Sequence, residues 1–255
     1  METLKIAAIQ ADLVWENPKA NRAYFDAQIE NLTHPVDLVI LPEMFSTGFS
    51  MNPLLNADEG ETLSWMKQKA TEKNTAIAGS LKVKDNDHYY NRFYFVTPEG
   101  TVTHYDKRHL FTLTGEHNVY RRGEKPVIVN YKGWTILLQV CYDLRFPVFA
   151  RNTSNYDLVL YVANWPKKRI FAWDTLLKAR AIENMCYCIG VNRVGLDTNS
   201  YEYNGHSGIY DSLGATLAFA ESDEKTIYTT LTKEHLSETR NQLNFLADQD
   251  AFTLE

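Results

Sequence analysis

The sequence predicts an α/β fold in which helices cover the faces of β-sheets. Short apolar runs of the kind found in buried strands alternate with segments that carry apolar residues at helical spacing. Several of these runs are separated by clusters that contain Pro or Gly, as expected for turns and hairpins. The composition, with 44% hydrophobic and 23% charged residues, is typical of a folded protein. Strands that alternate with helices in this way favour layered α/β architecture.

The first part of the chain begins with a strand and a helix. Residues 4–10 form a continuous apolar run and predict a buried strand. Asn17 and Pro18 then open a predicted helix, because Pro is favoured in the first helical turn. Residues 37–41 predict a second strand, and a second helix is marked by apolar residues at helical spacing, namely Leu63, Met66 and Ala70.

Three further runs follow the second predicted helix. Residues 75–80 predict a strand, and residues 89–96 and 101–105 predict a hairpin, because the four residues between them include Pro and Gly. The segment from about residue 107 to 125 reads as a long loop. Loops of this length are often functional.

The second part of the chain repeats these signals. The predicted strands cover residues 135–141, 157–162, 186–192, 209–211, 217–220 and 226–231. A predicted helix covers residues 173–184, and a polar tail contains residues 236–246. No change in composition marks a linker, so we predict one domain over residues 1–255.

Two segments in the two parts of the chain resemble each other. Residues 37–41 read Asp-Leu-Val-Ile-Leu, and residues 157–161 read Asp-Leu-Val-Leu-Tyr. A weak internal repeat is one interpretation. The other is chance similarity between apolar strands that follow an Asp, and the sequence does not separate the two.

Charge and cysteine content narrow the functional class. The 26 basic and 32 acidic residues give a formal charge of −6, the wrong sign for binding nucleic acid or an anionic membrane. No window approaches the roughly 18 apolar residues that span a bilayer, and the first residues lack the features of a secretory signal. Three cysteines fit free thiols in a reducing compartment. We therefore expect a cytoplasmic protein whose partner is a small molecule.

Three predicted strands end in chemically reactive side chains. They are Glu43, Lys107 and Cys141. Ligands of α/β folds usually bind where strands end, and a carboxylate, an ammonium and a thiol are the components of a nucleophilic hydrolase. Each residue taken alone has an ordinary explanation, as a solvated strand end, a surface charge or a buried thiol in the core.

The chemistry that these three residues support is thiol-based hydrolysis. A free thiol with a pKa of about 8.5 needs a base beside it, and Glu43 can take the proton from Cys141. The ammonium of Lys107, together with the backbone N–H of Tyr142, can stabilise the oxyanion of a tetrahedral intermediate.

The sequences around these residues resemble the motifs of the nitrilase (carbon–nitrogen hydrolase) superfamily. They are Leu-Pro-Glu43-Met-Phe, Tyr-Asp-Lys107-Arg-His-Leu-Phe and Val-Cys141-Tyr-Asp-Leu-Arg-Phe-Pro, in the order of the family. The resemblance implies that Glu43 is the general base, that Lys107 stabilises the oxyanion and positions groups, and that Cys141 is the nucleophile. Glu116 falls where the family has a second, supporting glutamate.

The resemblance also implies a fold, an assembly and a substrate class. Family members share a four-layer αββα sandwich, commonly form homodimers and need no metal or organic cofactor. Residues 42–49, 161–166 and 179–184 resemble the bacterial omega-amidase branch, which hydrolyses 2-oxoglutaramate and related monoamides of dicarboxylates. Other aliphatic or N-carbamoyl amidases and nitrilases share the same catalytic residues and remain alternatives. A different class, a catalytically inactive binding protein, is disfavoured because all three reactive residues are present.

Two other groups of residues have competing interpretations. Cys186 and Cys188 lie one residue apart, but no second Cys or His pair accompanies them, so packing is favoured over a metal site. If the substrate carries a carboxylate far from its amide, an arginine should receive it. Arg145, Arg169 and Arg193 lie near predicted strand ends, and the sequence does not choose among them.

Overall fold

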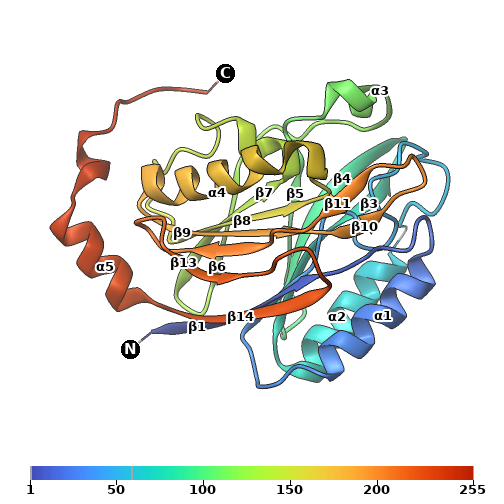
Figure 1. Cartoon of the computed structure of the whole chain (residues 1–255), viewed down its shortest axis with the longest axis horizontal. Coiled ribbons are helices and arrows are strands. Elements are labelled where there is room, and N and C mark those ends of the chain that lie inside the picture. Colours follow the sequence, from blue (N-terminus) through green and yellow to red (C-terminus); the bar gives the residue numbers. More distant parts are fainter. Residues whose placement is uncertain (1, 59, 255) are drawn as a thin grey trace.

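The computed structural model describes residues 2–58 and 60–254, and two six-stranded sheets form its centre (Figure 1). The first sheet contains β1 (Thr3–Gln10), β2 (Leu38–Ile40), β3 (Ala76–Asp85), β4 (His88–Val96), β5 (Val102–Asp106) and β14 (Lys225–Thr232). The second sheet contains β6 (Val127–Tyr131), β7 (Trp134–Val140), β8 (Leu158–Ala163), β9 (Tyr187–Asn192), β12 (Gly208–Tyr210) and β13 (Thr216–Phe219). A short ribbon pairs β10 (Val194–Leu196) with β11 (Glu202–Asn204).

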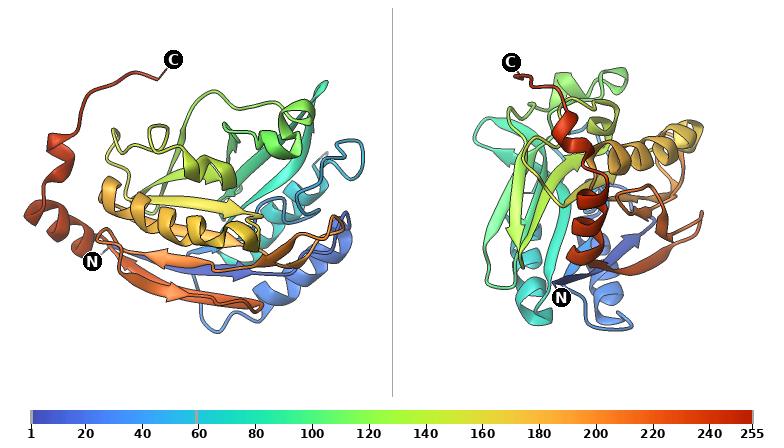
Figure 2. Two further views of the ribbon diagram at one scale, coloured as in Figure 1. Left: turned by 45° about the horizontal axis from the view of Figure 1, so that its top comes forward. Right: turned by 90° about the vertical axis from the view of Figure 1, so that its left-hand side faces the viewer.

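Helices cover the outer faces of the two sheets. The α-helices are α1 (Pro18–Glu30), α2 (Glu61–Lys73), α3 (Glu116–Val119), α4 (Ile170–Asn184) and α5 (Lys233–Gln242). Short 3₁₀ turns are η1 (Thr112–Thr114), η2 (Cys141–Arg145), η3 (Lys167–Arg169) and η4 (Phe245–Asp248). Figure 1 and the two views in Figure 2 show α1 and α2 on the opposite side of the sheets from α4. In the part of the chain described here, no helix is long and apolar enough to cross a membrane.

Three apolar clusters hold the layers together. Successive residues of a strand point to opposite faces, so Ile6 and Ala8 of β1 pack between the sheets while Ala7 and Ile9 pack under α1 and α2. The third cluster lies between the second sheet and α4. The layer order is therefore helix, sheet, sheet, helix, as expected for the αββα sandwich.

The two sheets have the same topology. Their orders are β14-β1-β2-β3-β4-β5 and β6-β7-β8-β9-β12-β13, and in both only the second, third and fourth strands run parallel to one another. The shared topology places β2 and β8, which overlap the two similar segments, in equivalent positions.

The aspartates that precede β2 and β8 make the same hydrogen bonds. A carboxylate oxygen of Asp37 accepts from the backbone N–H of Lys5 at 2.8 Å, and one of Asp157 accepts from that of Thr135 at 2.8 Å. The backbone N–H of each aspartate also donates to the carbonyl of the same residue, Lys5 for Asp37 at 2.8 Å and Thr135 for Asp157 at 2.9 Å. The structure therefore favours the interpretation as an internal repeat, in which Asp fixes the start of the third strand of each sheet.

Several elements differ from the prediction, and β10, β11 and the short helix α3 are among those that were not predicted. β3 continues to Asp85 rather than ending at residue 80, because its later residues pair with β4 as a hairpin. β6 was not predicted, and the polar tail contains α5. The sequence of α5 gave no helical signal because the helix lacks a clear apolar stripe. Leu236 packs into the core, and the Arg240 guanidinium fixes the helix by donating hydrogen bonds to backbone carbonyls.

Candidate active site

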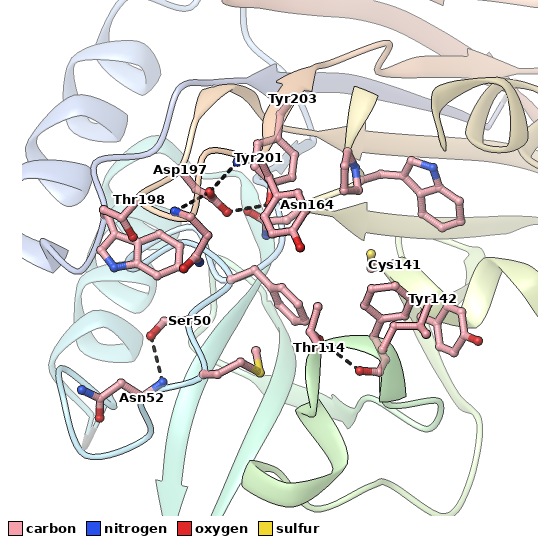
Figure 3. A pocket seen from close by; sticks show the side chains of 18 of the residues that line it. Ser50, Asn52, Thr114, Cys141, Tyr142, Asn164, Asp197, Thr198, Tyr201 and Tyr203 are labelled. Carbon is pink, nitrogen blue, oxygen red and sulfur yellow. Dashed lines mark hydrogen bonds between the residues drawn. The ribbon is translucent and has the colours of Figure 1, made fainter. Parts of the chain in front are cut away.

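Cys141 lies at the end of β7, as expected, and begins the turn η2. Its backbone has φ of 45°, a left-handed conformation that costs energy for a residue other than Gly. The side chain borders a cavity of about 840 Å³. Figure 3 shows Cys141 and Tyr142 on one side of this cavity, with Asp197 and Thr198 on the other. A strained residue that opens onto a cavity is a common feature of functional sites.

Asp143 holds this turn against the segment that carries Lys107. The Asp143 carboxylate is buried and accepts hydrogen bonds from the N–H of Val140 at 2.9 Å and the hydroxyl of Tyr105 at 2.8 Å. Its other oxygen accepts from the backbone N–H of His109 at 2.9 Å. Asp143 therefore fixes the turn that follows the nucleophile candidate relative to the loop after β5.

Glu43, Lys107 and Glu116 meet in a fully buried cluster of charges. All three side chains have an exposed fraction of 0%. The Lys107 ammonium donates to Glu43 Oε1 at 3.0 Å and to both Glu116 oxygens at 3.0 and 2.9 Å. Glu43 follows β2, Lys107 follows β5 and Glu116 begins α3, so the cluster joins three segments of the first half of the chain.

The charges in this cluster shift the pKa values of Lys107 and Glu116. Burial by itself lowers the pKa of Lys107, but the two adjacent carboxylates raise it above its ordinary value, so this lysine stays protonated. Burial raises the pKa of Glu116, and the nearby negative charge of Glu43 adds to this, while Lys107 opposes both effects. Two carboxylates against one ammonium leave the cluster with a negative charge when both are ionised.

This negative charge also acts on Cys141. Burial raises the pKa of the Cys141 thiol well above its ordinary value, and the charge of Glu43 raises it further, whereas Lys107 lowers it. The thiol is therefore neutral in the resting protein. Attack by its sulfur requires that the proton be removed during the reaction rather than before it.

Glu43 accepts hydrogen bonds from two asparagines as well as from Lys107. Asn91 Nδ2 donates to Oε1 at 2.7 Å, and the backbone N–H of Asn164 donates to Oε2 at 2.7 Å. Asn164 Nδ2 also donates to the backbone carbonyl of Glu43 at 2.7 Å. Since Asn164 follows β8, the second sheet fixes a carboxylate that belongs to the first.

The structure separates the three arginine candidates. Arg145 and Arg169 line the same cavity as Cys141, and their guanidinium groups stack on the rings of Trp165 and Phe111 at 4.9 and 5.0 Å. Arg193 instead is buried and forms an ion pair of 2.7 Å with Asp12. Its role in this structure is to join segments of the fold.

The acidic groups of the cavity wall already have partners. Glu16 pairs with the buried ammonium of Lys82 at 2.7 Å. Asp197 accepts hydrogen bonds from two backbone N–H groups at 2.9 Å and from the Tyr203 hydroxyl at 3.0 Å. Arg145 and Arg169 therefore supply the charge of the wall that is available to a ligand.

The other predicted residues have clear locations. Cys186 and Cys188 are buried in the apolar cluster beneath α4, in agreement with a packing role. Tyr142 lines the cavity, and its N–H belongs to the first turn of η2, where N–H groups have no partner within the helix. Within residues 2–58 and 60–254, no group of three or more His, Cys, Asp or Glu side chains is arranged to hold a metal ion.

Sequence reasoning missed Asn91, Asp143 and Asn164. Asp143 lies two residues after Cys141, and Asn164 directly follows β8. Both belong to the motifs that resemble the family, so a buried polar role was detectable from the sequence. Asn91 gave a weaker signal, an amide among aromatic residues in the middle of a strand. Asn is depleted in strands, and a buried one requires hydrogen-bond partners.

Comparison with known proteins agrees with this architecture. The family model for carbon–nitrogen hydrolases matches residues 5–241. Omega-amidase YafV of Yersinia enterocolitica is 45% identical, and the match covers 100% of both chains. A 2-oxoglutaramate amidase of Bacillus subtilis is 31% identical, with 95% of this chain and 96% of that protein covered.

A solved structure shares the whole fold. XC1258 from Xanthomonas campestris, described as a CN-hydrolase superfamily protein with an arsenic adduct in its active site, is 41% identical with a TM-score of 0.97, and 100% of each chain is covered. The predicted αββα architecture and the predicted resemblance are confirmed. The protein belongs to the carbon–nitrogen hydrolase family.

Proposed function

We propose that this protein is an omega-amidase, which hydrolyses the terminal amide of small dicarboxylate monoamides such as 2-oxoglutaramate and releases ammonia. The observation that carries the proposal is the buried Glu43–Lys107–Glu116 cluster next to Cys141, at a cavity whose available charges are two arginines. The names of the two relatives with 45% and 31% identity support the same substrate class.

The first step forms a thioester on Cys141. Glu43 takes the thiol proton while the sulfur attacks the amide carbon, because the thiol is neutral at rest. The carbonyl oxygen becomes an oxyanion. Net charge is conserved, since Glu43 loses its negative charge as the oxyanion gains one.

Lys107 changes partner during this step. At rest its ammonium is occupied by the carboxylates of Glu43 and Glu116. Protonation of Glu43 removes the charge that attracts Lys107 on one side, so one N–H becomes available for the oxyanion. The N–H of Tyr142 is the second donor. Such interactions are stronger in the transition state than in bound substrate, as catalysis requires.

Glu43 then returns its proton. It protonates the amide nitrogen, the C–N bond breaks, and ammonia leaves while the thioester carbonyl reforms. In the second half-reaction, Glu43 takes a proton from water and the resulting hydroxide attacks the thioester. The sulfur then leaves and recovers that proton from Glu43. Glu116 keeps Lys107 in place throughout, because both of its carboxylate oxygens accept hydrogen bonds from the ammonium.

The cavity favours a substrate with a carboxylate at its far end. Arg145 and Arg169 line it, whereas Glu16 and Asp197 are already paired. An alkyl nitrile offers no anionic group to these arginines. An N-carbamoyl amino acid does carry a carboxylate and is therefore the second candidate substrate.

We also propose that residues 1–255 act as one domain in a cytoplasmic homodimer. Apolar side chains on the outer face of α4 and on the adjacent turn support the dimer, since Phe171, Ile182 and Leu213 are 81%, 50% and 51% exposed. A second copy of the chain would cover these exposed apolar side chains.

Replacing Cys141 with Ala should abolish ammonia release and leave the fold intact, because it removes only the attacking sulfur. Cys186→Ala and Cys188→Ala are the matched controls and should keep activity, with a loss of stability from the core cavity. Mass spectrometry of the wild-type enzyme during turnover should detect an acyl adduct on Cys141. Substantial turnover by Cys141→Ala would exclude the thioester mechanism.

The Glu43→Gln variant should lose at least about 10²-fold in the rate of Cys141 acylation, the lower end for general-base catalysis. Substrate affinity should change much less, because Gln has the same shape. Single-turnover measurements separate the two quantities. Glu124→Gln, an exposed acid in a loop, is the control. Acylation at the wild-type rate in Glu43→Gln would remove Glu43 from the role of base.

The double variant Arg145→Met, Arg169→Met should raise KM for 2-oxoglutaramate about tenfold or more, since a hydrogen bond to a charged group is lost. Hydrolysis of butanamide, which lacks the far carboxylate, should be unchanged or improved. The single variants assign the effect to one arginine or both, and Lys168→Met, an exposed neighbour in η3, is the control. An equal loss of kcat/KM for both substrates would show that the arginines do not bind the substrate carboxylate.

A further inference from the structure

Asn91 touches every member of the buried cluster, although no part of the proposed mechanism uses it. Its side chain is fully buried in β4. The amide nitrogen donates to Glu43 Oε1 at 2.7 Å and lies 3.4 Å from Glu116 Oε1, and its backbone carbonyl accepts the N–H of Lys107 at 2.9 Å. A single residue therefore sets the relative positions of all three charged groups.

Asn91 and Lys107 occupy corresponding places between the two carboxylates. Lys107 Nζ and Asn91 Nδ2 each contact both Glu43 Oε1 and Glu116 Oε1. The lysine supplies a positive charge, whereas the amide supplies two N–H dipoles and no charge. A second cation at this place would neutralise the cluster and weaken the base. The amide holds the carboxylates in position and preserves the net negative charge.

The orientation of the Asn91 amide is fixed by Ser80. The buried Ser80 hydroxyl accepts the N–H of Met44 at 2.9 Å, so its single hydrogen is free to be donated to Asn91 Oδ1, also at 2.9 Å. The atom that receives this hydrogen must be the amide oxygen, and the NH₂ group therefore faces Glu43. Because Met44 follows Glu43 directly, the same hydroxyl also anchors the turn that carries the base.

We propose that Asn91, oriented by Ser80, is a positioning residue that stabilises the ionised form of Glu43 and thereby sets the pH at which Cys141 can be deprotonated. The proposal rests on the proposed amidase function and names a further determinant of its base. The charged and titratable groups facing Glu43 from the surrounding elements are Lys107, Glu116, Cys141 and Tyr120, and all of these remain in the variants below.

The pH profile of kcat/KM tests this role. In Asn91→Ala the carboxylate loses a donor, so the acid limb of the profile should move up by about one to two pH units, with KM little changed. Ser80→Ala keeps Asn91 but frees its orientation, and it should shift the limb in the same direction by a smaller amount. Asn130→Ala, at an exposed position in β6, is the control and should keep the wild-type profile.

A second readout does not depend on the substrate. The rate of alkylation of Cys141 by iodoacetamide, followed by mass, should show the same displacement of its acid limb in Asn91→Ala. If the wild-type protein releases no ammonia from any omega-amide, the proposed function fails, while alkylation still decides the role of Asn91. An acid limb at the wild-type pH, whatever the height of the plateau, would overturn the proposal.

Discussion

A buried ammonium between two buried carboxylates is the interaction on which this structure depends. Removing each of the three charges from water costs several kcal/mol, and the mutual attraction of Glu43, Lys107 and Glu116 offsets this only in a tight arrangement with every hydrogen bond made. The turn after β2, the loop after β5 and the start of α3 must therefore meet correctly. The same constraint makes the loop at residues 107–125, which looks irregular in the sequence, part of the chemistry.

The duplicated sheet topology explains how nucleophile and base come together. Glu43, Lys107 and Glu116 come from the first half of the chain, whereas Cys141 and Asn164 follow β7 and β8 of the second sheet. Backbone and side chain of Asn164 bind Glu43 directly. The site thus lies where the two sheets join, and a shift of one sheet against the other would separate the base from the thiol.

The sequence predicted the layered fold and the three reactive strand ends because these depend on local patterns and on short motifs. Apolar runs mark β1, β2 and β8, and motifs mark Glu43 and Cys141. It did not predict the partners that orient these groups. Asn91 lies 48 positions from Glu43 and Asn164 lies 121 positions from it, so their hydrogen bonds depend on sheet register and sheet packing. For the same reason the sequence does not distinguish Arg193 from Arg145, because the ion-pair partner of Arg193, Asp12, lies 181 positions away.

The central claim is that the nucleophile rests as a neutral thiol and gives its proton to Glu43 only during attack. The most direct measurement is the ultraviolet absorbance of the thiolate, taken as the difference between wild type and Cys141→Ala across a pH titration. Since burial and Glu43 raise the pKa of Cys141, the account predicts no thiolate signal at neutral pH and a step only above the free-thiol value of about 8.5. A thiolate step centred at or below neutral pH would contradict it, because the sulfur would then be deprotonated before any substrate arrives.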